Sequence, residues 1–215
     1  MKTKLRFSFV VILALVLCFS CTRPSFTLMG LHTGLSLVHQ GNSEGTLISN
    51  YESLSVFIES EEDATLQMEI TSPDGLNTWL FPAARKSVGK QGYYGNTGLS
   101  LGPSMPLPSG EWTLRVLSSD GRTITENFTL ERGSDPQPFV HHLDAEKGIL
   151  VLDEQVKECS LQLLDREKKI LYSTLTTEQA LDLARFYPTW DQVRFVGLTW
   201  YDEAARMSQI VWYTL

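Results

Sequence analysis

The sequence predicts a mainly β protein, in which a larger β-sandwich is followed by a smaller β-rich unit with one short helix. Three observations support this fold class: apolar and polar residues alternate along much of the chain, turn-forming residues separate the alternating runs, and one stretch alone has a helical pattern. With the first 20 residues set aside, 195 residues remain. That length is enough for one large or two small domains without disulfide bonds.

The start of the chain has the order of residues that is typical of a secretion signal. Lys2, Lys4 and Arg6 precede an apolar run over residues 7–19, and the small residue Ser20 follows it. This order predicts a signal peptide over residues 1–20. The run is shorter than the approximately 20 apolar residues of a transmembrane helix. Cleavage after Ser20 to release an ordinary secreted protein is the remaining alternative.

The cysteine directly after Ser20 makes this segment similar to the signals of bacterial lipoproteins. Cys18 stands where such signals usually carry leucine and Phe19 is bulky, so the segment resembles the relaxed signals of spirochaete lipoproteins. The resemblance implies cleavage between Ser20 and Cys21 and acylation of Cys21, which would attach the mature chain to the lipid bilayer by several acyl chains. Thr22 replaces the aspartate that retains some lipoproteins at the inner membrane, so we expect an envelope protein of the outer membrane.

The charge of the mature chain limits its partners. Residues 21–215 contain 15 basic and 25 acidic residues, which gives a net charge of −10. Such a chain is a poor ligand for nucleic acid and is not attracted to anionic headgroups, so acylated Cys21 would have to provide the membrane attachment. Cys159 is the remaining cysteine, and its place among leucines predicts a buried strand residue.

Residues 21–44 are rich in serine, threonine and glycine and predict a lipidated N-terminus and spacer, with a first strand near residues 35–38. Strands are clearer from residue 45 onward, where Leu66, Met68 and Ile70 alternate with polar residues. An Asp-Gly pair at residues 120–121 predicts a hairpin. Residues 108–116 (PSGEWTLRV) resemble the late strands of bacterial immunoglobulin-like and pre-peptidase C-terminal modules. The resemblance implies an immunoglobulin-like antiparallel β-sandwich over residues 45–132.

Residues 133–138 contain two prolines without periodicity and predict a linker to a second unit over residues 139–215. In that unit, Thr176 and Gln179 form a capping-box pattern and Pro188 is a stop signal, so we expect a helix near residues 177–187. The last strand places Ile210 and Trp212 on one side and Val211 and Tyr213 on the other.

Residues 82–109 predict a long loop, because glycine and proline recur throughout them. Loops of this length are often functional. Tyr93 and Tyr94, flanked by glycines, are the candidate binding surface, whereas Trp79 and Trp112 are expected in the core.

Catalytic and metal-binding motifs are absent from the sequence. Adjacent His141 and His142 point to opposite faces of an extended chain, and the acidic run at residues 59–63 lacks the spacing of a calcium loop. We therefore expect no catalytic residues, no metal and no cofactor.

The sequence as a whole favours a non-enzymatic, lipid-anchored envelope protein that acts as a binding or structural module, with an unknown ligand or an envelope protein as its partner. Two alternatives remain: a cell-envelope hydrolase that uses carboxylates of the long loop, and a surface-exposed adhesin.

Overall fold

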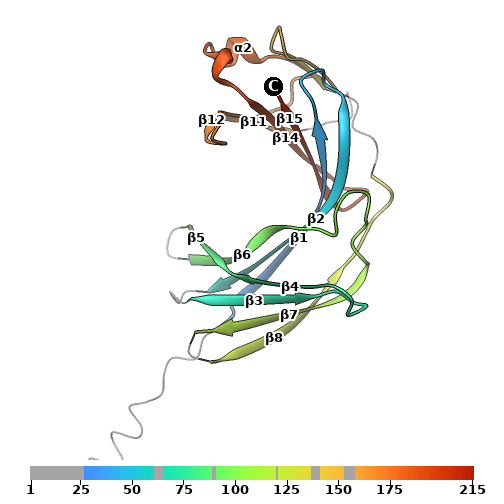
Figure 1. The fold of residues 1–215 in the computed structure, drawn as a ribbon, viewed down its shortest axis with the longest axis vertical. Helices are drawn as coiled ribbons and strands as arrows, with labels where there is room; N and C mark the ends of the chain where they lie inside the picture. Colours follow the sequence, from blue (N-terminus) through green and yellow to red (C-terminus); the bar gives the residue numbers. More distant parts are fainter. Residues whose placement is uncertain (1–26, 61–64, 89–90, 120, 137–140, 153–157) are drawn as a thin grey trace, which may run out of the picture.

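The computed structural model describes residues 27–60, 65–88, 91–119, 121–136, 141–152 and 158–215. Over these residues the protein is mainly β, as predicted, and its strands form three sheets (Figure 1). Within the described ranges, helical structure is confined to α2 (Leu183–Phe186) and the 3-10 turn η1 (Trp190–Gln192). None of the described helices has the length and apolar character needed to cross a membrane.

The largest sheet has eight strands and extends through both halves of the chain. Its order is β12-β11-β14-β15-β1-β2-β6-β5, and neighbouring strands are antiparallel except for the parallel pair β15 and β1. Its strands are β1 (Gly30–Gly41), β2 (Leu47–Ser60), β5 (Ala84–Val88), β6 (Gln91–Leu99), β11 (Cys159–Leu164), β12 (Ile170–Thr176), β14 (Phe195–Asp202) and β15 (Met207–Thr214).

Two smaller antiparallel sheets pack on this large sheet. One has the order β4-β3-β7-β8 and the other the order β13-β10-β9. Their strands are β3 (Leu66–Thr71), β4 (Thr78–Pro82), β7 (Gly110–Ser118), β8 (Thr123–Leu130), β9 (His141–Asp144), β10 (Ile149–Leu152) and β13 (Ala180–Asp182).

Each smaller sheet encloses its own hydrophobic core, and both cores lie on the same face of the eight-stranded sheet. Met207 belongs to the core under the four-stranded sheet, whereas Val211 and Tyr213 belong to the core under the three-stranded sheet. These positions on β15 differ by even numbers, so their side chains point to the same side. In the first core Trp112 stacks between Trp79 and Phe128, with ring centroids 5.8 and 6.2 Å away.

The eight-stranded sheet is bent into an arc (Figure 1). Strands β5 and β6 form one arm, and β11, β12, β14 and β15 form the other. Strands β3, β4, β7 and β8 lie on the outer side of the first arm, and α2 lies on the outer side of the second (Figure 1). The opposite face of the large sheet is therefore left without a covering layer and faces the open side of the arc.

Local sequence explains two of the hairpin turns, of which the one between β7 and β8 was predicted. The turn after β3 is held by Asp74, whose carboxylate accepts bonds from the Ser72 hydroxyl at 2.5 Å and the Leu76 amide at 3.0 Å. Hydrogen bonding lowers the pKa of Asp74, the bond from Ser72 being the largest cause. In the β7–β8 turn, Gly121 has a φ of 87° and donates to the Ser118 carbonyl. That conformation suits glycine.

Three expectations differ from the structure. The spacer over residues 21–44 contains β1, which pairs along its length with β2 and joins the sheet of the second half. The eight-stranded sheet thus includes strands from both sides of the linker at 133–138. The loop over residues 82–109 contains β5 and β6, which extend the same sheet.

The helix expected near residues 177–187 is reduced to one turn, α2. Residues 180–182 instead pair with β10, and Leu181, opposite Leu150, is buried with it in the second core. Burial of this strand outweighs the local helical pattern. The cap of the short helix is Asp182, which accepts from the Arg185 amide at 3.0 Å.

Candidate functional site

The uncovered face of the eight-stranded sheet, which we call the open face, is the candidate site. It carries the side chains that alternate with the core residues, such as Trp212 between Val211 and Tyr213 and Gln162 between Leu161 and Leu163. Strand pairing brings six of its residues into one line across six strands. This line, here named the tryptophan row, consists of Ser173, Gln162, Gly197, Trp212, Gln40 and Ser49.

The ring of Trp212 lies over the backbone of the neighbouring strand at Gly197. A Cβ atom added at Gly197 would be 2.3 Å from Trp212 Cζ3 and 2.6 Å from Cη2, so the absence of a side chain there makes room for the indole. Phe57 lies over Gly95 on the same face, where an added Cβ would be 2.6 Å from Phe57 Cδ1. Two aromatic rings therefore lie against the open face, each opposite a glycine.

Polar groups surround Trp212 within its row. Gln40 and Ser49 are directly opposite each other, and the Ser49 hydroxyl donates to Gln40 Oε1 at 3.1 Å. Trp112 and Trp190 each donate an indole N–H to a backbone carbonyl at 3.1 Å, whereas no such bond from Trp212 is found among the described residues. The row thus presents one aromatic ring, two amides and two hydroxyls.

The centre of the open face carries no charge at neutral pH. The row beside the tryptophan row consists of Leu175, Ser160, Thr199, Ile210, Val38 and Tyr51. Beyond it lie Tyr201, Ser208, Ser36 and Ser53, and Tyr201 is 61% exposed. Residues 21–215 carry a net charge of −10, so this uncharged surface contrasts with the rest of the chain.

The structure separates the two tyrosines that were predicted to share a binding surface. Tyr94 is 1% exposed and belongs to the first core, so it cannot contribute to a surface. Tyr93 is half-buried on the open face, where its ring lies 5.8 Å from that of His32. The difference follows from the strand, in which adjacent side chains point to opposite faces. His32 Nε2 is 3.4 Å from a carboxylate oxygen of Glu59.

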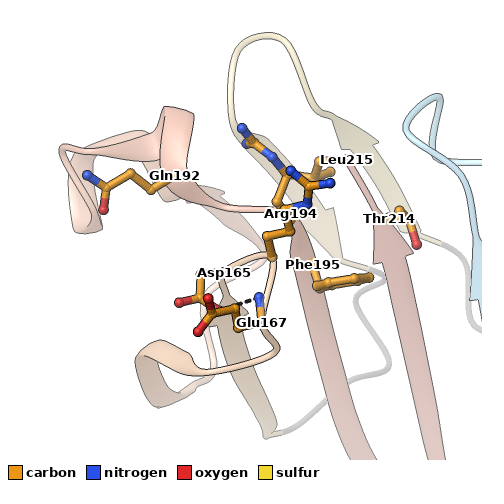
Figure 2. Close-up of a pocket in the computed structure, with 8 residues that line it drawn as sticks. Asp165, Glu167, Gln192, Arg194, Phe195, Thr214 and Leu215 are labelled. Atoms are coloured by element: carbon orange, nitrogen blue, oxygen red, sulfur yellow. Dashed lines mark hydrogen bonds between the residues drawn. The ribbon is translucent and has the colours of Figure 1, made fainter.

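A hollow of about 520 Å³ lies at one end of this face (Figure 2). It is lined by Asp165, Arg166, Glu167, Gln192, Arg194, Phe195, Thr214 and Leu215. Two of its charged side chains are engaged locally: Arg194 Nη1 donates to the carbonyls of Asp191 and Val193 at 2.6 and 2.7 Å, and the Asp165 carboxylate accepts from the Glu167 amide. No serine, cysteine or histidine is among these lining residues, so the hollow lacks the Ser–His or Cys–His pair of an acyl-transfer site.

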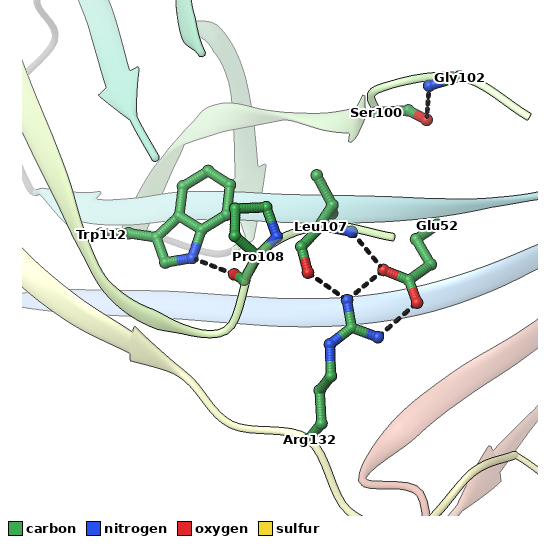
Figure 3. A network of polar contacts seen from close by, with 7 residues as sticks. All are labelled: Glu52, Ser100, Gly102, Leu107, Pro108, Trp112 and Arg132. Atoms are coloured by element: carbon green, nitrogen blue, oxygen red, sulfur yellow. Dashed lines mark hydrogen bonds and ion pairs between the residues drawn. The ribbon is translucent and has the colours of Figure 1, made fainter. Parts of the chain in front are cut away.

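A second polar cluster lies on the core side of the sheet and joins three segments (Figure 3). Arg132 donates two bonds to the Glu52 carboxylate and one to the Leu107 carbonyl, and the Leu107 amide donates to Glu52 at 2.6 Å. The hydrogen bonds to Glu52 raise the pKa of Arg132. We call this cluster the Glu52–Arg132 joint. Because every group in it is paired, its role is structural.

His39 and Gln209 occupy the core side between the two cores. His39 is 9% exposed, and burial lowers the pKa of its imidazole although a hydrogen bond with the Gln209 side chain opposes the effect. Gln209 Nε2 also donates to Asp202 at 3.0 Å. Sequence reasoning missed these residues and the Glu52–Arg132 joint, because a polar residue in an alternating strand gives no sign of its face.

Other predicted residues form no site. Cys159 is buried, and burial raises the pKa of its thiol to about 11, which disfavours the reactive thiolate. No group of three metal-ligating side chains is found in the described part of the chain. Residues 82–109 contain no aspartate or glutamate, so the hydrolase alternative has no carboxylates there. Ser20 and Cys21 lie outside the described residues.

Comparison with known proteins adds no relative. No protein-family model matches the chain, and no curated protein matches it.

Proposed function

We propose that the chain is a lipid-anchored protein of the cell envelope, at the outer membrane, that acts as a non-enzymatic binding module through its open face. The observation that carries the proposal is the uncovered sheet face itself. Both smaller sheets pack on one side of the eight-stranded sheet, and the other side carries Tyr201, which is 61% exposed, together with the half-buried Trp212 and Phe57. Extended exposed surfaces with aromatic side chains are characteristic of interaction sites.

The position of the anchor supports this use of the open face. Gly30, where β1 begins, is nine positions after Cys21, and at about 3.6 Å per residue this segment spans at most about 32 Å. Gln40 in the tryptophan row is ten residues further along β1, about 33 Å away at about 3.3 Å per residue. An acylated Cys21 would therefore hold the start of β1 near the bilayer. The tryptophan row would lie further from the bilayer, along β1.

The experiment that tests the anchor compares Cys21→Ser with Cys18→Ser in cells grown with a clickable palmitate analogue. We expect the wild type and Cys18→Ser to incorporate the label and to sediment with membranes. We expect Cys21→Ser to lose both properties, because Cys21 is the acylated residue. An intact mass without acyl groups in the wild type, or label that remains in Cys21→Ser, would contradict the proposal.

A further inference from the structure

We propose that the tryptophan row binds a neutral glycan, with one hexose ring stacked on Trp212 and its neighbours held by the flanking amides. This inference rests on the proposed function, since it names the class of ligand for the open face. It joins three properties of the row that are independent of one another: the position of its ring, its hydrogen-bonding groups and its lack of charge.

The first property is the position of the indole. A pyranose ring has one face of C–H groups, and this apolar face packs well on a flat aromatic surface. The six-membered ring of Trp212 lies over Gly197, so one side of the indole rests on the sheet, and the side chain is half-buried, which leaves part of the ring open to a ligand. A tryptophan combines a large apolar area with a single polar N–H, which suits a ligand of mixed character.

The second property is the set of groups beside the ring. Gln40 follows Trp212 on one side, and Gly197 and then Gln162 follow on the other, so two amides flank the ring along the row. Each amide offers two donors and one acceptor oxygen, as sugar hydroxyls require. Neighbouring strands are about 4.8 Å apart, close to the length of one sugar unit, so a linear glycan can follow the row across the strands.

The third property is the lack of charge. The tryptophan row and the row through Ile210 and Tyr51 contain no ionised side chain, and the mature chain has a net charge of −10. An anionic polysaccharide would require arginine or lysine contacts and would meet a repulsive field. A bound acyl chain would require a continuous aliphatic lining, whereas Val38, Ile210 and Leu175 are the aliphatic side chains of these rows, and the hydroxyl residues Ser160 and Thr199 separate Leu175 from the other two.

The test measures binding of neutral hexasaccharides to the full chain, solubilised in a detergent that has no sugar headgroup. The probes are cellohexaose, laminarihexaose and N-acetylchitohexaose, followed by calorimetry and by tryptophan fluorescence. We expect at least one of them to bind with a Kd of about 0.1–1 mM, which is the affinity expected from a few polar contacts and one stacked ring. Trp212→Phe identifies the part of the fluorescence change that arises from Trp212.

The variants locate the site. Trp212→Ala is expected to weaken binding at least tenfold, and Gln40→Ala about fivefold. Gln67→Ala is the matched control, because Gln67 is an exposed glutamine on the outer face of the four-stranded sheet, and it should bind as the wild type does. Should Trp212→Ala fail to fold by circular dichroism, Gln40→Ala and Trp212→Phe still report on the row, because they keep a side chain over Gly197.

Two results would overturn the inference: none of the hexasaccharides binds, or one binds with equal affinity to the wild type, Trp212→Phe and Gln40→Ala. Binding of a protein at the open face in place of a glycan would also overturn it and leave the proposed function standing. If the wild type carries no acyl group, that result contradicts the proposed function. It does not affect the binding measured in detergent.

Discussion

Replacing Arg132 by alanine is expected to lower the free energy of unfolding by about 2 kcal/mol. The substitution removes two hydrogen bonds to Glu52 and one to the carbonyl of Leu107. The side chains of Arg132 and Glu52 are 25% and 13% exposed, so the pair is intermediate between a fully exposed and a fully buried ion pair. Exposed pairs contribute about 0–1 kcal/mol, and removal of one partner from a fully buried pair costs about 3–5 kcal/mol.

The assay is urea unfolding followed by circular dichroism, for Arg132→Ala, Glu52→Ala and the double variant. For a chain of this size a loss of about 2 kcal/mol lowers Tm by about 4–8 °C. The double-mutant cycle should give a coupling energy of about 1–2 kcal/mol, because both singles remove the same bonds.

A neighbouring ion pair provides the matched control. Arg206 Nη1 lies 2.6 Å from Glu131 Oε2, but these side chains are 59% and 66% exposed. Solvent screening should reduce their coupling to less than about 0.5 kcal/mol. A coupling energy for Glu52 and Arg132 no larger than that for Glu131 and Arg206 would refute the reasoning.

Three further predictions concern single residues. Cys159 should react with a thiol reagent in Cys18→Ser/Cys21→Ser chains only after unfolding, since burial raises its pKa to about 11; rapid labelling of the folded chain would contradict its burial. The pKa of His39 is lowered from 6.5, so the unfolded chain binds more protons below that value. Its contribution to stability should be complete above about pH 7 and decline as the pH falls through 6.5, and the pH dependence of urea unfolding should flatten in His39→Leu; identical profiles would contradict this assignment. Gly197→Ala should displace Trp212, lower stability by about 1–2 kcal/mol and shift the tryptophan emission, whereas an unchanged spectrum would show that the ring does not cover the glycine.

The sequence predicted the parts of the fold that depend on local signals. Strand β3 follows from the alternation of Leu66, Met68 and Ile70, and the hairpin of β7 and β8 follows from the Asp-Gly pair between them in the sequence. The last strand was predicted to place Trp212 and Val211 on opposite sides, as the structure shows. These features require information from a few neighbouring residues, which a single sequence contains.

Features that depend on distant segments were not predictable. Strand β1 is rich in glycine and polar residues, and its parallel partner β15 lies about 170 residues away along the chain. No local signal in the residues of β1 distinguishes a strand that pairs with a distant segment from an unpaired spacer. The open face was missed for the same reason, because the periodicity of β15 separates its two faces without showing which one the smaller sheets cover.

The open face is proposed as the binding surface of an anchored protein, and this role can be tested directly. The direct measurement is photo-crosslinking in intact cells, with a photoreactive residue at Gln40 or Ser173 in the tryptophan row and at Gln67 on the outer face of the four-stranded sheet. We predict adducts at positions 40 and 173 and none at position 67. Adducts at position 67 alone, or equal yields at all three positions, would contradict the account.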